Sequence, residues 1–384
     1  MITKFSHARI VGENAILDAE NVYVKDGKII AITNESYPFD KEVDVNGRFL
    51  APGFIDLHVH GGADCDFMDG NEEAVVKAAN FHYQNGTTTI CPTTLSASYE
   101  QTTAALDAIQ KAVDSGKILP NVAGVHMEGP YFAPAKCGAQ NLTYITPPVP
   151  EDYNRILQDY KGLVKRWSFA PELPGAKEFV ETLNEKHVLT SIGHSDATYE
   201  DVMAVYERGC RSITHFYNCI SSITKEKGYR ILGITECGYL LKDMMLEVIA
   251  DGCHVPKELF RMLYQIKGSD HLCLVTDAMR CAGSKEEISH IGGVPCKIKN
   301  GVACLLDESS FAGSVATADR LIRFCVKDVG IDLCEAVKMM TVNPAKVLGL
   351  KSKGRIAVGY DADLVIFDEN IQIESVFHCR NHSN

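Results

Sequence analysis

The stretch Leu50-Ala-Pro-Gly-Phe-Ile-Asp-Leu-His-Val-His-Gly61 indicates how this chain folds and where its chemistry lies. Its Pro-Gly pair ends a loop, and residues 54–59 then alternate with the period of a β-strand. His58 and His60 are two residues apart, so their side chains project to the same side of that strand. Two imidazoles at the carboxyl end of a strand can chelate one divalent metal ion, and two ordinary polar histidines at the edge of a core are the alternative.

The composition bounds the class of protein. The 384 residues, 46% of them hydrophobic, are enough for a large core and too many for one small domain. The formal net charge is -12 and no basic stripe is present, so we expect no nucleic-acid partner. We expect no membrane association, because no run approaches the roughly 20 apolar residues of a membrane helix and the N-terminus lacks the core of a signal peptide. Fourteen cysteines without a Cys-x-x-Cys pair argue against a zinc ribbon and favour a reducing cytoplasm.

Short β-strands are predicted at both ends of the chain. Residues 21–32 have the pattern of a strand, an Asp-Gly turn and a second strand, and residues 354–368 carry a similar pattern. We therefore expect residues 1–52 and 346–384 to form one small β domain, a β-sandwich built from both chain ends. Residues 53–345 would form the central domain.

The central domain alternates strands with helices. Eight strands are predicted, at 54–59, 87–91, 122–127, 166–170, 188–192, 212–215, 245–250 and 272–276. Amphipathic helices are predicted at 72–84, 99–113, 153–160, 177–184, 199–207, 256–266, 317–326 and 333–340. Eight βα units predict an α/β fold, a (β/α)8 TIM barrel. A doubly wound open sheet is the alternative, but no Gly-x-Gly-x-x-Gly follows a strand.

Side chains with metal-binding chemistry stand at the ends of five predicted strands. In a barrel, the carboxyl ends of the strands carry the active site. Imidazole and carboxylate together suit zinc, iron or a similar divalent ion, and no thiolate site is indicated. A single histidine at a strand end is commonly just a satisfied polar group, whereas five such ends predict one metal centre. The residues are His58 and His60, Glu128, His194, His215 and Asp277.

The chain resembles the amidohydrolase superfamily and, within it, the deacetylases of N-acetylated amino sugar phosphates. The resemblance covers nearly the whole chain, and the His-Met-Glu-Gly-Pro segment is its most specific part. It implies a cytoplasmic enzyme of amino sugar catabolism that hydrolyses N-acetyl-D-glucosamine 6-phosphate to D-glucosamine 6-phosphate and acetate. The segments are Pro52-Gly-Phe-Ile-Asp-Leu-His-Val-His-Gly, His126-Met-Glu-Gly-Pro, Gly193-His-Ser, Thr214-His-Phe-Tyr-Asn, Ala250-Asp-Gly-Cys-His-Val, Val275-Thr-Asp-Ala-Met, Ala312-Gly-Ser, Asn343-Pro-Ala, Gly354-Arg-Ile and Gly359-Tyr-Asp-Ala-Asp-Leu-Val.

The same resemblance implies roles for the residues at the strand ends. The principal metal ion, zinc or iron, would be held by Glu128, His194 and His215. Asp277 would act as general base and then as general acid, with service as one more ligand as the alternative. His58 and His60 would complete a second site that shares Glu128. Some members of the family bind two metals and others one, so we expect one ion per chain and allow a second.

Substrate contacts carry over from the family less completely. They fall on Asn218 and Cys219, on Asp251 and His254, and on Phe311, Ala312 and Gly313. Where relatives often have a His after Lys-Gly-Ala, this chain has Ala139 followed by Gln140, whose amide can donate a hydrogen bond but carries no charge.

The phosphate-binding Arg of the family is missing. Lys225 is the best replacement and Lys227 the second, and a solvated charge cluster is the alternative reading of both. Members of the family are commonly dimeric, with a neighbouring subunit reaching the phosphate, so we expect a homodimer. Because this loop and Gln140 depart from the family, N-acetylgalactosamine 6-phosphate or a related acetamido sugar stays an alternative substrate. A non-catalytic sugar-phosphate sensor is disfavoured, since every metal residue and Asp277 are present.

Overall fold

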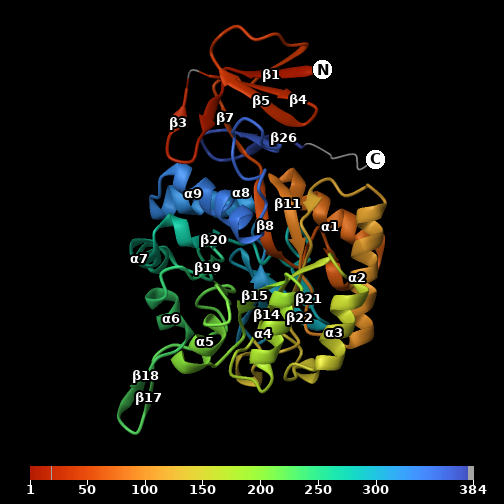
Figure 1. Cartoon of the computed structure of the whole chain (residues 1–384), viewed down its shortest axis with the longest axis vertical. Coiled ribbons are helices and arrows are strands. Elements are labelled where there is room, and N and C mark those ends of the chain that lie inside the picture. The colour runs from red at the N-terminus through yellow and green to blue at the C-terminus, as the bar shows by residue number, and fades with distance from the viewer. Residues whose placement is uncertain (19, 379–384) are drawn as a thin grey trace.

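The computed structural model describes residues 1–18 and 20–378. Small sheets built near both termini lie at one end of the molecule, and a larger body of parallel strands surrounded by helices makes up the rest (Figure 1). No helix within the described ranges is long and apolar enough to cross a membrane.

The parallel strands form two arcs, and every neighbouring pair within an arc is parallel. All eight predicted strands are confirmed, most of them to within two or three residues. The first arc has the order β12-β11-β8 and the second β13-β14-β15-β16-β19-β20. Their bounds are β8 Phe54–Val59, β11 Thr87–Pro92, β12 Asn121–Val122, β13 Val125–Glu128, β14 Val164–Phe169, β15 Leu189–Ile192, β16 Ser212–Ile213, β19 Met245–Val248 and β20 Leu272–Leu274.

The predicted strand 122–127 is divided into β12 and β13. Between the two pieces Gly124 has φ +132°, and a Cβ atom there would lie 2.0 Å from the Lys165 side chain. The chain therefore passes from one arc to the other at a position that only glycine can occupy. The arcs also meet through backbone hydrogen bonds, from Thr94 N–H to the His126 carbonyl at 3.0 Å and from Asp277 N–H to the His58 carbonyl at 2.9 Å.

Helices cover the outside of the strands (Figure 1). Several begin at a polar cap, as α2 does where Ser98 and Gln101 satisfy each other's backbone N–H groups. The predicted helix 317–326 is α8 followed by a π-helical segment, Phe324–Val329, and α6 and α10 were not predicted. The bounds are α1 Glu72–Gln84, α2 Tyr99–Asp114, α3 Pro150–Asp159, α4 Ala176–Glu185, α5 Tyr199–Tyr206, α6 Ile234–Leu240, α7 Lys257–Lys267, α8 Ala318–Arg323, α9 Leu333–Met339 and α10 Val342–Val347.

Two sheets near the termini combine both ends of the chain. The first has the order β5-β4-β1-β6, from β1 Ile2–Ser6, β4 Asn21–Lys25, β5 Lys28–Thr33 and β6 Lys41–Asp44. The second has the order β26-β25-β7-β2-β3, from β2 Arg9–Val11, β3 Ile16–Leu17, β7 Phe49–Pro52, β25 Leu364–Phe367 and β26 Ile373–Phe377. A shared apolar cluster that includes Phe5, Leu50 and Leu364 packs the two sheets together.

Three excursions from the strand–helix alternation were not predicted, and the smallest is the antiparallel pair of β9 (Gly61–Gly62) and β10 (Cys65–Asp66). The other two are larger. A hairpin of β17 (Thr224–Glu226) and β18 (Tyr229–Ile231) projects away from the body (Figure 1). A four-stranded antiparallel sheet lies between β20 and α8 and is formed by β21 Ile288–Ile291, β22 Val294–Lys299, β23 Val302–Leu305 and β24 Phe311–Ser314. Both larger excursions follow strands whose carboxyl ends carry the predicted metal residues.

Candidate metal centre and active site

The six predicted metal and catalytic side chains converge at the carboxyl ends of the parallel strands. His58 lies in β8 and His60 directly after it, and Glu128 is the last residue of β13. His194, His215 and Asp277 lie two or three residues beyond β15, β16 and β20. All six are buried, so their polar groups must be satisfied by one another or by a ligand.

Glu128, His194 and His215 form the first group of potential ligands. Glu128 Oε1 lies 3.1 Å from His215 Nε2 and 3.3 Å from His194 Nε2, and these two nitrogens are 3.1 Å apart. The backbone carbonyl of Lys136 accepts a hydrogen bond from His194 Nδ1 at 2.9 Å, which leaves Nε2 with its lone pair toward the group. The three ligand atoms lie within 4.8 Å of one another.

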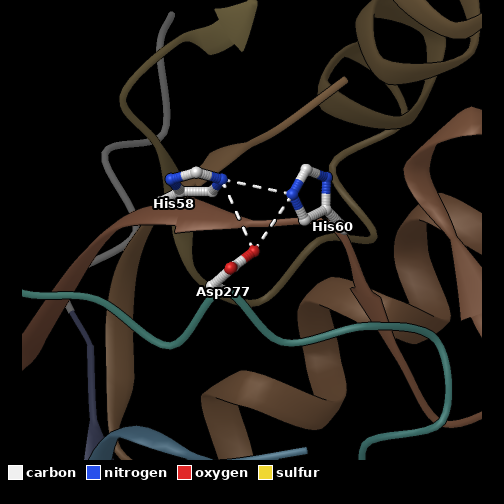
Figure 2. Close-up of side chains that lie close together, drawn as sticks. All are labelled: His58, His60 and Asp277. Carbon is white, nitrogen blue, oxygen red and sulfur yellow. Dashed lines mark hydrogen bonds and ion pairs between the residues drawn. The ribbon is translucent and has the colours of Figure 1, made fainter. Parts of the chain in front are cut away.

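His58, His60 and Asp277 form the second group (Figure 2). The two Nε2 atoms are 3.1 Å apart, and Asp277 Oδ1 lies 3.6 Å from that of His58 and 3.2 Å from that of His60. Glu128 stands between the two groups, because its Oε1 is 3.3 Å from His58 Nε2 and its Oε2 is 3.3 Å from His60 Nε2.

The donor set fits divalent metal ions. Four imidazole nitrogens and two carboxylates point their lone pairs into one buried space, an arrangement that repels itself unless protons or cations occupy it. His126 is equally buried nearby but does not belong to the set, since its Nε2 lies 2.7 Å from the Ser168 hydroxyl. The residues therefore provide one complete three-ligand group and a second group beside it.

The buried imidazole and carboxylate groups strongly affect one another's pKa values. Burial by itself lowers the pKa of His58 and His60, but the carboxylates of Glu128 and Asp277 outweigh burial and raise these pKa values to about 9 and about 10. Burial alone would raise the pKa of Asp277, yet the two histidines hold it below its ordinary value. Asp277 is therefore ionised at neutral pH and can accept a proton.

A second layer of buried charge holds His58, and sequence reasoning missed it. Glu247 in β19 places Oε2 3.6 Å from His58 Nδ1, while its Oε1 contacts the guanidinium of Arg166 from β14. Arg166 also donates to the Leu57 carbonyl at 3.2 Å. A signal for Glu247 was present in the sequence, because it is the single charged residue of β19, whereas Arg166 stands beside Lys165 in β14.

A cavity of about 220 Å³ opens onto both ligand groups. It is lined by seven of the predicted substrate residues, Ala139, Gln140, Asn218, Cys219, His254, Phe311 and Gly313. The lining also includes Leu95, Tyr217, Met279, Ile291 and Ser310, which were not predicted. Part of the wall thus comes from the unpredicted antiparallel sheet, through β21 and β24.

The other three predicted substrate residues lie outside this lining. Asp251 supports His254, accepting a hydrogen bond from its Nδ1 at 2.8 Å and leaving Nε2 free for a ligand. Ala312 is buried in β24, and Lys225 is exposed on the projecting hairpin. None of the described residues that line the cavity is a lysine or an arginine. Gln140 does line it, but its amide is held by Glu128 and Ser96.

An α/β fold with imidazole and carboxylate ligands at the carboxyl ends of parallel strands defines the class as metal-dependent hydrolases. The model of the amidohydrolase family matches residues 49–382. The chain therefore belongs to the amidohydrolase family.

Curated relatives and solved structures narrow the likeness. N-acetylglucosamine-6-phosphate deacetylase of Lysinibacillus sphaericus is 33% identical over 356 residues, which are 91% of this chain and 90% of the relative. N-acetylgalactosamine-6-phosphate deacetylase of Escherichia coli O157:H7 is 28% identical over 96% of each chain. A mutant N-acetyl-D-glucosamine-6-phosphate deacetylase of Mycobacterium smegmatis, in complex with N-acetyl-D-glucosamine-6-phosphate, superposes with a TM-score of 0.89 at 26% identity and covers 99% of this chain and 98% of its own.

Proposed function

We propose that this chain hydrolyses the acetamide of N-acetyl-D-glucosamine 6-phosphate and releases D-glucosamine 6-phosphate and acetate, a step of amino sugar catabolism. The observation that carries the proposal is the position of the ionised Asp277 carboxylate, which lines the cavity beside two groups of metal ligands. The names of the relatives support the substrate.

Glu128, His194 and His215 would hold the principal ion, zinc or iron, at one ion per chain. His58 and His60, with Glu128 and Asp277 beside them, would form the optional second site. A bound divalent ion lowers the pKa of a coordinated water toward about 7 and polarises a carbonyl oxygen.

Asp277 would move the proton. Its carboxylate is held ionised by His58 and His60, so it can accept a proton from the water that attacks the acetyl carbon. The same carboxyl group would then donate that proton to the departing nitrogen, and the C–N bond breaks to give acetate and the amine.

The sugar would be held by side chains around the cavity. His254 offers its Nε2 because Asp251 holds Nδ1, and its ring lies 4.9 Å from the ring of Phe311. Asn218 and Cys219 line the same cavity from the loop that follows β16 and His215. With these contacts the substrate phosphate would reach the mouth of the cavity, where the lining offers it no lysine or arginine among the described residues.

A homodimer would supply the missing cation. Lys225 is exposed on the β17–β18 hairpin, which projects from the body (Figure 1), and Lys227 lies at its turn. We propose that the hairpin of a second copy brings Lys225, with Lys227 as second candidate, to the phosphate. Lys225→Ala should then raise KM for the phosphorylated sugar more than it lowers kcat, whereas a solvated cluster would leave KM unchanged.

We also propose that the two arcs of parallel strands form one (β/α)8 barrel over residues 53–345. The hydrogen bonds that link the arcs at Thr94 and at Asp277 support closure. Residues 1–52 and 346–384 would form the separate small β domain, which the pairing of β25 with β7 supports. A cytoplasmic location stays a prediction.

An acetate-release assay tests the proposal, with zinc, iron or manganese supplied to metal-free protein. We expect kcat/KM to be higher for N-acetylglucosamine 6-phosphate than for its galactosamine epimer, because specificity is expressed in that ratio. The reverse order would favour the second candidate, which the Escherichia coli relative supports. No release from either epimer with any metal would overturn the proposed activity and favour a sensor.

A further inference from the structure

Gln140 lines the cavity and also contacts Glu128, which lies between the two groups of metal ligands. It is buried, and its side-chain amide is fixed at both ends. The backbone N–H of Ser96 lies 2.7 Å from Gln140 Oε1, and Gln140 Nε2 lies 2.7 Å from Glu128 Oε2. The amide thus bridges the chain after β11 and the last residue of β13.

The orientation of this amide follows from chemistry. A backbone N–H can only donate, so the Gln140 atom that faces Ser96 must be the oxygen. The NH2 group must then face Glu128, which as an ionised carboxylate can only accept. Gln140 therefore donates a charge-assisted hydrogen bond to Glu128 Oε2.

The two oxygens of Glu128 consequently have different surroundings. Oε1 lies 3.1 Å from His215, 3.3 Å from His194 and 3.3 Å from His58, and it carries no donor from Gln140. Oε2 faces the second group, 3.3 Å from His60, and is the oxygen that Gln140 occupies. A second ion that used Oε2 would have to compete with the amide for it.

We propose that Gln140 is a positioning residue that sets how many metal ions this centre holds. It keeps Glu128 serving the Glu128–His194–His215 group through Oε1 and weakens the second site by occupying Oε2. The inference rests on the proposed metal-dependent function and deepens it, because a chain with both ligand groups and an occupied Oε2 would bind the first ion more tightly than the second.

Metal titrations of metal-free protein test this, with Zn²⁺ followed by calorimetry and Mn²⁺ by electron paramagnetic resonance, in which two adjacent ions give a spin-coupled signal. Gln140→Leu removes the donor with little change in volume. A hydrogen bond to a charged group corresponds to a factor of about 10 to 150 in an equilibrium constant. We expect the ratio of the second to the first dissociation constant to shrink by at least about 10-fold, and the coupled Mn²⁺ signal to appear at lower metal concentration.

Two further variants separate positioning from general disruption. Gln140→His keeps one acceptor and one donor in a neutral imidazole and should restore much of the wild-type ratio. Gln101→Leu is the matched control, since the Gln101 Oε1 likewise accepts a backbone N–H, from Ser98 at 3.1 Å, but the side chain is exposed at the start of α2. Its ratio should equal that of the wild type.

The outcomes distinguish this inference from the function on which it rests. An unchanged ratio in Gln140→Leu, or a weaker first site with an unchanged second site, would overturn the role of Gln140. Two ions bound equally tightly by the wild type would also overturn it, while leaving the deacetylase proposal intact. Failure of the wild type to bind any divalent ion would instead overturn the proposed metal centre itself.

Discussion

The buried pair of Arg166 and Glu247 allows the stability of the strands to be separated from the chemistry of the metal centre. Both side chains are at most 1% exposed, and together they link β14 to β19 beneath His58. Burial would raise the pKa of Glu247, but Arg166 and His58 hold it below its ordinary value, so the carboxylate is charged. Arg166→Met would leave that charge buried without the guanidinium, which is nearer to it than His58.

The expected cost can be worked out. Removing one partner of a buried ion pair costs about 3–5 kcal/mol. An unfolding entropy of about 2.1 cal/mol/K per residue over 384 residues gives about 0.8 kcal/mol/K. Arg166→Met should therefore lower the Tm of the metal-free protein by about 4–6 °C. Differential scanning calorimetry with a chelator present measures this shift directly.

A double variant separates the contribution of the ion pair to stability from its contribution to metal binding. Arg166→Met combined with Glu247→Met removes both charges, and replacing a buried ion pair by apolar side chains is commonly neutral or stabilising. The Tm should return to near the wild-type value. The second metal site should bind its ion about 10–100-fold more weakly than in the wild type, because His58 Nδ1 has lost the carboxylate 3.6 Å away. A single variant that melts within about 1 °C of the wild type, corresponding to less than about 1 kcal/mol, would refute the reasoning. So would a double variant that is less stable than Arg166→Met.

Three other expectations concern the site. Asp277→Asn should lower kcat by about 10²–10⁴-fold while metal analysis still finds the principal ion; unchanged turnover would contradict the proposed base. Folding raises the pKa of His58 and His60 from an unfolded value of about 6.5 to about 9 and about 10, so their stabilisation of metal-free protein is complete below pH ~6.5 and is lost toward pH 9–10. The Tm of metal-free protein should fall as the pH is raised across this range, and a Tm that rises would contradict the expected direction. Gly138→Ala should lower the free energy of unfolding by roughly 1–2 kcal/mol because the backbone there is left-handed, and by more because the new Cβ would lie 2.6 Å from Cys219 Sγ. Adding Cys219→Ala should recover only the part that is due to this contact. Denaturant unfolding measures both losses.

Most of the strands were predictable because they are short, largely apolar runs that the fold buries on both faces, and every residue of β8 is buried in this way. Strands that are only partly buried and pair chiefly with each other, as in β21–β24, were missed, and so was the brief helix α6. Such elements depend on partners that are brought together by the fold, which local periodicity does not encode.

The metal residues were predictable for a related reason. A parallel sheet brings the carboxyl ends of its strands together, so the positions of His58, Glu128 and His215 in the sequence already implied one site. The direction of the β17–β18 hairpin, and hence the place of Lys225, depends on a projecting loop with no such constraint. The contact between Gln140 and Glu128 likewise joins residues whose side-chain geometry no spacing rule specifies.

The backbone at the strand ends shows how the fold supports the ligands. His194, His215 and Asp277 have φ values of +46°, +29° and +47°, in the left-handed region that non-glycine residues seldom adopt. Such conformations cost of order 1–3 kcal/mol each and persist only where the surroundings determine them. Here the surroundings are backbone hydrogen bonds of the strand ends themselves, such as Asp277 N–H to the His58 carbonyl at 2.9 Å. The strain therefore lies in the turns that aim the ligands, while the buried strands behind them provide the stability that offsets it.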